Sequence, residues 1–127
     1  MPEITILYAG ILGLMAIGLG ATAGVYRGNA GISFGDGGDD ELRMRMRRHA
    51  NFVENAPLAL ILIGLLEIQS IPVWAVHGLG GAVVAGRALH AYGFSGGVTS
   101  PMRGIGAGIT ALAIAIASVW AVVEFFL

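Results

Sequence analysis

The chain has 127 residues, of which 56% are hydrophobic and 12% are charged, and it contains 21 glycines. Its mean hydropathy of +0.80 is too high for an ordinary soluble domain and indicates an integral membrane protein. The net charge of -1 argues against nucleic acid as a partner, and the absence of cysteine means that any thiol chemistry must come from a ligand.

The first predicted transmembrane helix covers residues 4–26. The segment from Ile4 to Val25 is uncharged, and at about 1.5 Å per residue it crosses a hydrocarbon core about 30 Å thick. Because the N-terminus lacks a basic region and a convincing cleavage site, we expect this helix to remain in the membrane and not to be removed as a signal peptide. Residues 27–41 are rich in Gly, Asp and Asn, which predicts a loop.

Three further helices are predicted, over residues 43–68, 72–94 and 102–126. The apolar run at 56–66 is too short to span a membrane alone, so the second helix must begin earlier and carry polar residues to membrane depth. Pro72 suits the first turn of the third helix. The predicted fold is an all-α integral membrane protein, a single domain over residues 1–127 built as a bundle of four transmembrane helices.

The arginines of the loops predict the orientation. They surround the first and third loops, whereas the second loop has none. The positive-inside rule then places the first and third loops in the cytoplasm. Since four spans put both termini on the same side of the membrane, both termini are expected outside.

One polar stripe follows the second helix. At 100° per residue, a single face carries Arg43, Arg47, Asn51 and Glu54. A charged group at mid-membrane costs at least about 2.5 kcal/mol, so an intramembrane carboxylate usually faces a partner or a water-filled cavity. We therefore expect Glu54 to face one of these.

Other polar residues flank this stripe. Arg45 and Arg48 are interpreted as a flank that binds lipid headgroups. On the third helix, Arg87 and His90 are spaced i, i+3 and share one face. Because Glu54 offers an opposite charge in the same leaflet, we expect Glu54 and Arg87, with Arg47 as a further member, to form a buried polar network between helices, a role that can be purely structural.

Metal and nucleotide sites are not predicted. His49, His77 and His90 have no i, i+4 pairing and no carboxylate cluster faces them. The segment GDGGDD lacks the Lys and Ser or Thr of a phosphate loop and the distal glutamate of a calcium loop. The remaining signal is a cationic and amide-rich pocket that opens to the cytoplasm and suits a small anionic ligand.

The chain contains three motifs, RRHANFVENAP, GRALHAYGF and SPMRG. Together they resemble the MAPEG family, the membrane-associated proteins of eicosanoid and glutathione metabolism. The likeness covers nearly the whole chain and is especially close to short, poorly characterised bacterial members. It implies a homotrimer. We expect this assembly in a bacterial inner membrane, in contact with lipid, and the positive-inside rule then places both termini in the periplasm. Glutathione, the expected cosubstrate, would bind between subunits and react with lipophilic electrophiles or hydroperoxides.

The resemblance also assigns roles to individual residues. The positions that match glutathione-binding or ligand-facing residues are Arg27, Arg47, Asn51, Glu54, Arg87 and His90. Arg27 matches a contact to a glutathione carboxylate, and Glu54 is placed to receive the ammonium group. Arg103 matches the arginine beside the thiol and is the expected catalytic residue. A neighbouring guanidinium lowers a thiol pKa, and each unit is worth about 1.36 kcal/mol of preference for the thiolate.

The chain also departs from the family pattern. Eicosanoid-type relatives have tyrosine at the position of Phe94, and some relatives have serine and tyrosine where this chain has Gly104 and Ala107. At Gly104 and Ala107, two hydroxyls that could hold the sulfur are therefore missing. The family's acidic residue six positions before His49 is replaced by Arg43, with Glu41 as a shifted substitute.

Three functions follow from these observations. The leading hypothesis is a membrane-embedded glutathione transferase or peroxidase of the microsomal type. The missing hydroxyls motivate the alternative, a non-catalytic membrane protein that binds a small thiol, an anionic lipid or a protein partner. The third is a small exporter in which Glu54 carries the proton, although arginines outnumber carboxylates around it.

Overall fold

A computed structural model describes residues 1–93 and 100–127, which form four α-helices. These are α1 (Glu3–Asn29), α2 (Asp40–Ile68), α3 (Val73–Gly93) and α4 (Pro101–Phe126). The predicted all-α fold is confirmed. Within the described ranges, α1, α2 and α4 are long and apolar enough to cross a membrane. A fourth span over residues 72–94 stays a prediction, and its expected last residue, Phe94, lies outside the described residues.

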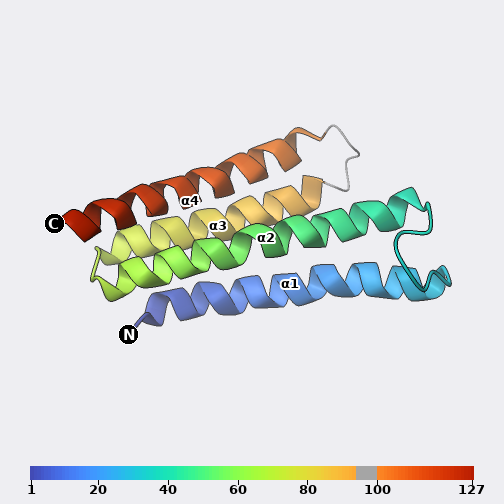
Figure 1. Ribbon diagram of the computed structural model, residues 1–127, viewed down its shortest axis with the longest axis horizontal. Helices are drawn as coiled ribbons and strands as arrows, with labels where there is room; N and C mark the ends of the chain where they lie inside the picture. Colours follow the sequence, from blue (N-terminus) through green and yellow to red (C-terminus); the bar gives the residue numbers. More distant parts are fainter. Residues whose placement is uncertain (94–99) are drawn as a thin grey trace.

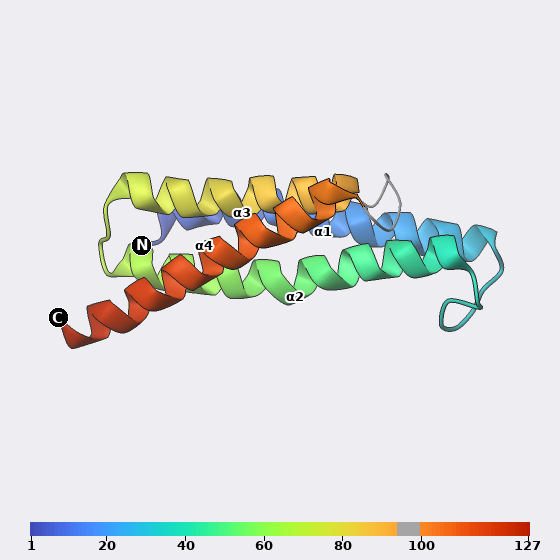
Figure 2. The same cartoon turned by 90° about the horizontal axis from the view of Figure 1, so that it is seen from above.

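The four helices lie alongside one another (Figure 1), with both termini at the same end of the bundle. The loop between α1 and α2 lies at the opposite end. Viewed at right angles (Figure 2), α4 runs obliquely across the bundle, starting beside the C-terminal end of α3. The first halves of α2 and α4 and the last part of α3 are therefore brought to the same end, which is where the candidate site lies.

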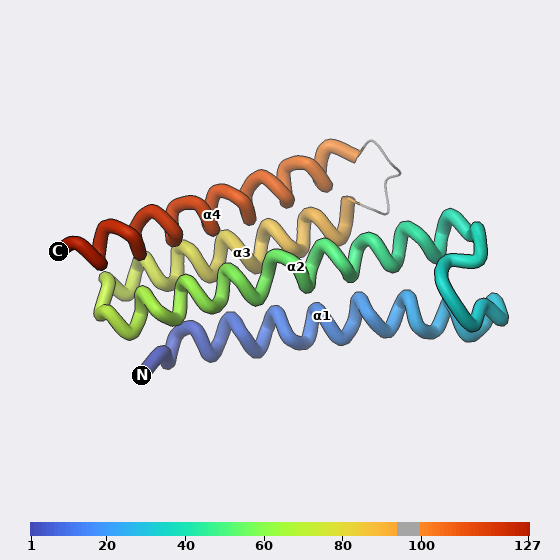
Figure 3. The backbone as a smooth tube through the Cα atoms, viewed as in Figure 1, coloured from blue at the N-terminus to red at the C-terminus, as the bar shows by residue number. Residues whose placement is uncertain are grey.

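The second helix begins earlier than predicted because it has a side-chain cap. The Asp39 carboxylate accepts a hydrogen bond from the backbone N–H of Leu42 at 2.9 Å, and two acidic residues in the first turn suit the positive end of the helix. The helix therefore starts at Asp40 and not at residue 43. Figure 3 shows α2 as one unbroken helix, and it continues through Pro57 to the end of the apolar run.

Large apolar side chains lie on both the inside and the outside of the bundle. Phe52, Ile63 and Val83 belong to a buried cluster to which all four helices contribute. Leu14 and Val119 are among many large apolar side chains that stay exposed. An apolar exterior of this extent is unusual for a soluble protein and suits contact with lipid.

Arg45 joins α2 to α1, while the headgroup-binding flank expected at this residue stays a prediction. Its Nε donates to Glu41 at 2.7 Å and its Nη1 donates to the carbonyl of Thr22 at 3.3 Å. Its guanidinium carbon also lies 4.8 Å from the centre of the Tyr26 ring, a cation–π distance. The sequence pattern could not show this because Tyr26 and Thr22 lie on a different helix.

Candidate functional site

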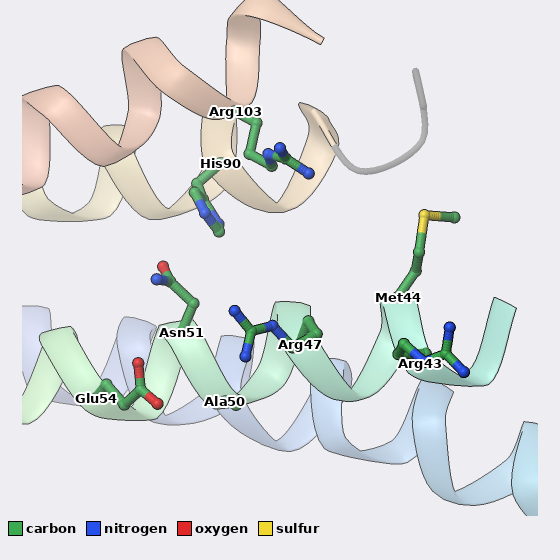
Figure 4. A pocket seen from close by; sticks show the side chains of 8 residues that line it. All are labelled: Arg43, Met44, Arg47, Ala50, Asn51, Glu54, His90 and Arg103. Atoms are coloured by element: carbon green, nitrogen blue, oxygen red, sulfur yellow. The ribbon is translucent and has the colours of Figure 1, made fainter. Parts of the chain in front are cut away.

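A pocket of about 390 Å³ lies between the first half of α2 and the adjoining ends of α3 and α4 (Figure 4). This volume falls within the range of about 300–1,000 Å³ that is typical of small-molecule sites. The lining residues are Arg43, Met44, Arg47, Ala50, Asn51, Glu54, His90 and Arg103. Residues of three helices, distant in sequence, therefore meet around one hollow.

The wall formed by α2 is the stripe expected from the sequence. Arg47, Asn51 and Glu54 all line the pocket, because residues three and four apart share one face of a helix. In Figure 4 the Asn51 side chain reaches from α2 toward the wall that carries His90. Arg47 and Glu54 are exposed, and Asn51 is half-buried. The pocket is thus open along one side.

His90 and Arg103 form the opposite wall, where α3 and α4 pack closely. His90 is buried, with 6% of its surface exposed. A Cβ atom at Gly106 would collide with the backbone of His90, and a Cβ atom at Gly93 would collide with the backbone of Arg103. These two glycines allow the helices to approach and bring His90 and Arg103 to the same side of the pocket.

Arg43 also lines the pocket, but acidic residues already bind it. Its Nε donates to Asp36 at 2.6 Å and its Nη1 donates to Asp40 at 2.7 Å. The backbone N–H of Gly38, followed by the Arg43 side chain, holds the pKa of Asp36 below its ordinary value. Glu41 pairs with Arg45 and is not part of the pocket lining. It lies outside the pocket of a single chain, and its role as a substitute for the acidic residue that Arg43 replaces stays a prediction.

Arg87 does not bind Glu54, so the expected contact between these residues is wrong. Only 1% of Arg87 is exposed, and its Nε and Nη1 donate to Thr110 Oγ1 at 2.9 Å and to Asn51 Oδ1 at 2.7 Å. Among the described residues, no carboxylate forms an ion pair with Arg87. The physical reason is direction: Arg87 points into the junction of α2, α3 and α4, whereas Glu54 lies on the exposed side of the α2 stripe.

Arg27 lies away from the pocket within this one chain. It is on α1, which contributes no residue to the lining, and its Nη2 contacts Met46 Sδ at 3.3 Å. The structure thus brings together five of the predicted site residues and leaves two outside the cavity. The five are Arg47, Asn51, Glu54, His90 and Arg103, and the two are Arg27 and Arg87.

The sequence analysis missed Thr110. This residue is fully buried and accepts the hydrogen bond from Arg87 Nε. Its signal in the sequence was weak: it is one of two hydroxyl residues, with Ser118, in a helix that is otherwise mostly apolar. Met44 and Ala50 also line the pocket and carry no chemical signal that would have singled them out.

The pocket suits an anion that also carries a positive group. Three arginines and one carboxylate line it, which leaves an excess of positive charge, and Asn51 adds an amide. Among the residues that the structure describes, no hydroxyl or thiol side chain belongs to the lining. Within the same ranges, no cluster of three His, Asp, Glu or Cys side chains could hold a metal ion.

The sequence is similar to a known protein family and to two bacterial proteins. The profile of the MAPEG family matches residues 5–123, which confirms the resemblance seen in the motifs. The inner membrane protein YecN of Escherichia coli (strain K12) is 41% identical over 63 residues, which is 50% of this chain and 48% of YecN. YecN of Escherichia coli O6:H1 (strain CFT073) gives the same identity and coverage. The match spans about half the length of these relatives.

Proposed function

Because the chain belongs to the MAPEG family, we propose that it is a membrane-embedded glutathione transferase or peroxidase that acts on lipophilic electrophiles or hydroperoxides. The observation that carries the proposal is the pocket in which His90 and Arg103 form the wall opposite the α2 residues Arg47, Asn51 and Glu54. Glutathione has two carboxylates, one ammonium group and one thiol. The pocket offers several cationic groups and one carboxylate, and no thiol or hydroxyl side chain is among the described lining residues.

The geometry suggests a division of roles. Glu54 receives the ammonium group of glutathione, while Arg47 and Asn51 bind its carboxylate or carbonyl oxygens. Arg103 lies beside the thiol, lowers its pKa and thereby raises the thiolate fraction; arginine suits this role because it keeps its charge. The thiolate then attacks an electrophilic carbon, forming a C–S bond as the leaving group departs with its electron pair. With a hydroperoxide, the thiolate attacks the terminal oxygen instead, so that an S–O bond forms as the O–O bond breaks. Glutathione is oxidised to a sulfenic acid, and the alkoxide leaves with the electron pair and takes up a proton to become an alcohol.

The proposal includes a membrane assembly. We place the chain in the inner membrane as four spans, which the three long apolar helices and the inner-membrane relative support. The pocket is open along the exposed side of α2, and Arg27 lies outside it. A homotrimer would account for both features, since a neighbouring copy could cover the open side and supply its own arginine from α1. Electrophiles that dissolve in the bilayer would reach the site from the lipid.

Calorimetric titration of the purified protein with glutathione tests this function. The wild type is expected to bind saturably at millimolar or lower concentration, and Glu54→Ala is expected to lose most of that affinity. Glu3→Ala is the matched control, because Glu3 is also exposed but lies at the opposite end of the bundle. Absence of binding at millimolar glutathione, or binding that is unchanged in Glu54→Ala, would rule the proposal out.

One observation favours a second function, a protein that binds a thiol without turnover. The positions at which some relatives carry hydroxyls are Gly104 and Ala107, and neither lines the pocket. Phe94, the third such position, lies outside the described residues. An assay with a reactive aryl halide separates the two functions. Saturable binding without product, together with thiolate absorbance that does not change in Arg103→Ala, would favour the binding protein.

A further inference from the structure

Three helices meet at Arg87, which takes part in a chain of hydrogen bonds that leads to the pocket. On α4, the Thr110 hydroxyl donates to the carbonyl of Gly106 at 3.0 Å and accepts from Arg87 Nε at 2.9 Å. On α2, Asn51 accepts from Arg87 Nη1 at its Oδ1, 2.7 Å away, and at its backbone carbonyl, 3.3 Å away. The chain therefore runs from α4 through the buried guanidinium to the one amide that lines the pocket.

The chemistry of these groups fixes the direction of the Asn51 amide. A guanidinium has only donors, so the atom of Asn51 that faces Arg87 must be the oxygen. The amide nitrogen then points away from Arg87. It makes no hydrogen bond to the described residues and is not among their buried unpartnered atoms. Asn51 therefore presents N–H donors to the pocket.

The position of Arg87 is itself fixed by packing. The Thr110 hydroxyl donates to Gly106, so its lone pairs remain for the guanidinium. A Cβ atom at Gly86 would collide with the Thr110 hydroxyl, so α3 leaves room for this group. Thr110 and Arg87 are both almost fully buried, and neither can change partner without opening the junction between the helices.

We propose that Arg87 and Thr110 are positioning residues that lock the Asn51 amide with its NH₂ group toward the pocket. This creates a subsite for a hydrogen-bond acceptor on the ligand, and we assign a carboxylate of glutathione to it. The assignment rests on the proposed function. Arg87 acts through Asn51 and does not touch the ligand, which differs from the direct ligand-facing role that the family resemblance gave it. A ligand group that only donates hydrogen bonds is excluded from this position.

The decisive variant is Asn51→Asp, tested for stability and for binding. The new carboxylate would face Arg87 and pair with it, so the melting temperature is expected to rise. The same change removes the N–H donors and brings a negative charge toward the ligand carboxylate. Glutathione affinity, measured by calorimetry, is therefore expected to fall by about 100-fold or more. A purely structural role for Asn51 would not produce these opposite changes in stability and affinity.

Thr110 provides the second arm. Thr110→Val removes the acceptor of Arg87 Nε at nearly constant volume, and glutathione binding is expected to weaken about tenfold, as for one lost hydrogen bond to a charged group. Thr110→Ser keeps the hydroxyl and should restore affinity. Thr22→Val is the matched control, because the Thr22 hydroxyl bonds only to a carbonyl of its own helix. The proposal is overturned if Thr110→Val binds as the wild type does, or if Asn51→Asp lowers the melting temperature.

These arms separate the positioning role from the proposed function. If the wild type binds no glutathione, the proposed function fails, and the melting temperatures still report the direction of the amide. A rise in Asn51→Asp, with a larger loss in Thr110→Val than in Thr22→Val, then supports the positioning role. If glutathione binds but its affinity is the same in Asn51→Asp, the function stands and the subsite is wrong.

Discussion

The close approach of α3 and α4 makes Gly106→Ala the most informative substitution for the architecture of the site. A Cβ atom at Gly106 would lie 2.5 Å from the carbonyl oxygen of Gly86 and 2.9 Å from His90 Cα. Real Cβ atoms essentially never come within 3.0 Å of non-bonded heavy atoms. Because these neighbours are backbone atoms, no side-chain rotation can relieve the clash, and the two helices must separate.

The expected cost can be worked out from two opposing effects. Overpacking of a core costs about 1–3 kcal/mol, and contacts with rigid backbone belong at the upper end. Alanine gains about 0.5–1 kcal/mol over glycine in a helix, which offsets part of this. The net loss of unfolding free energy is therefore about 2 kcal/mol. His90 would move with α3, so glutathione affinity should fall as well.

Matched controls lie on the same helix. Gly104 and Gly108 have no atom within 4 Å of an added Cβ atom, so alanine at either position should gain about 0.5–1 kcal/mol from helix propensity alone. Reversible unfolding in detergent micelles, followed by circular dichroism, measures all three variants. If Gly106→Ala is as stable as Gly108→Ala, the close contact that positions His90 does not exist.

Two further predictions concern the ends of helices. Glu67 accepts hydrogen bonds from the backbone N–H groups of Ile4 and Thr5 at 2.8 Å each, so Glu67→Ala should destabilise the start of α1 by about 0.5–2 kcal/mol. Hydrogen exchange at these two amides should accelerate, whereas Glu124→Ala should leave it unchanged. At α2, the N–H of Leu42 holds the pKa of Asp39 below its ordinary value of 3.8. The stabilising effect of this cap is therefore complete at neutral pH and is lost as the pH falls below that value; exchange at Leu42 should show this pH dependence, and Asp39→Asn should abolish it.

The α2 wall of the site could be predicted because it lies within one helix. Arg47, Asn51 and Glu54 are three or four residues apart, and the helical repeat alone places them on one face. His90 and Arg103 came from motif resemblance, and the pocket brings both to the facing wall. The presence of long apolar helices and their approximate bounds could also be predicted, because hydropathy is a local property of the chain.

Partners between helices could not be predicted in this way. Arg87 was matched to Glu54 because opposite charges at the same depth attract, but the packing of α3 on α4 turns Arg87 toward Thr110. The direction of the Arg87 side chain depends on how closely α3 and α4 approach, which glycines such as Gly86 allow. The periodicity within one helix does not show which helix packs against it. Arg27 differs again, because a single chain leaves it beside Met46, outside the pocket.

The hydrogen-bond acceptors around the Arg87 side chain are neutral, and this affects both the stability of the protein and the binding of the proposed ligand. Neutral acceptors satisfy the hydrogen bonds of a buried guanidinium but leave its positive charge uncompensated, and that is the situation at Thr110 and Asn51. A carboxylate at position 51 would neutralise the charge of Arg87, but it would also replace the amide whose N–H groups face the pocket. An anion bound at Asn51 instead neutralises part of the charge from outside, through the amide. If glutathione binds as proposed, asparagine at this position would leave the empty protein less stable than aspartate would, and the bound carboxylate would offset part of that difference.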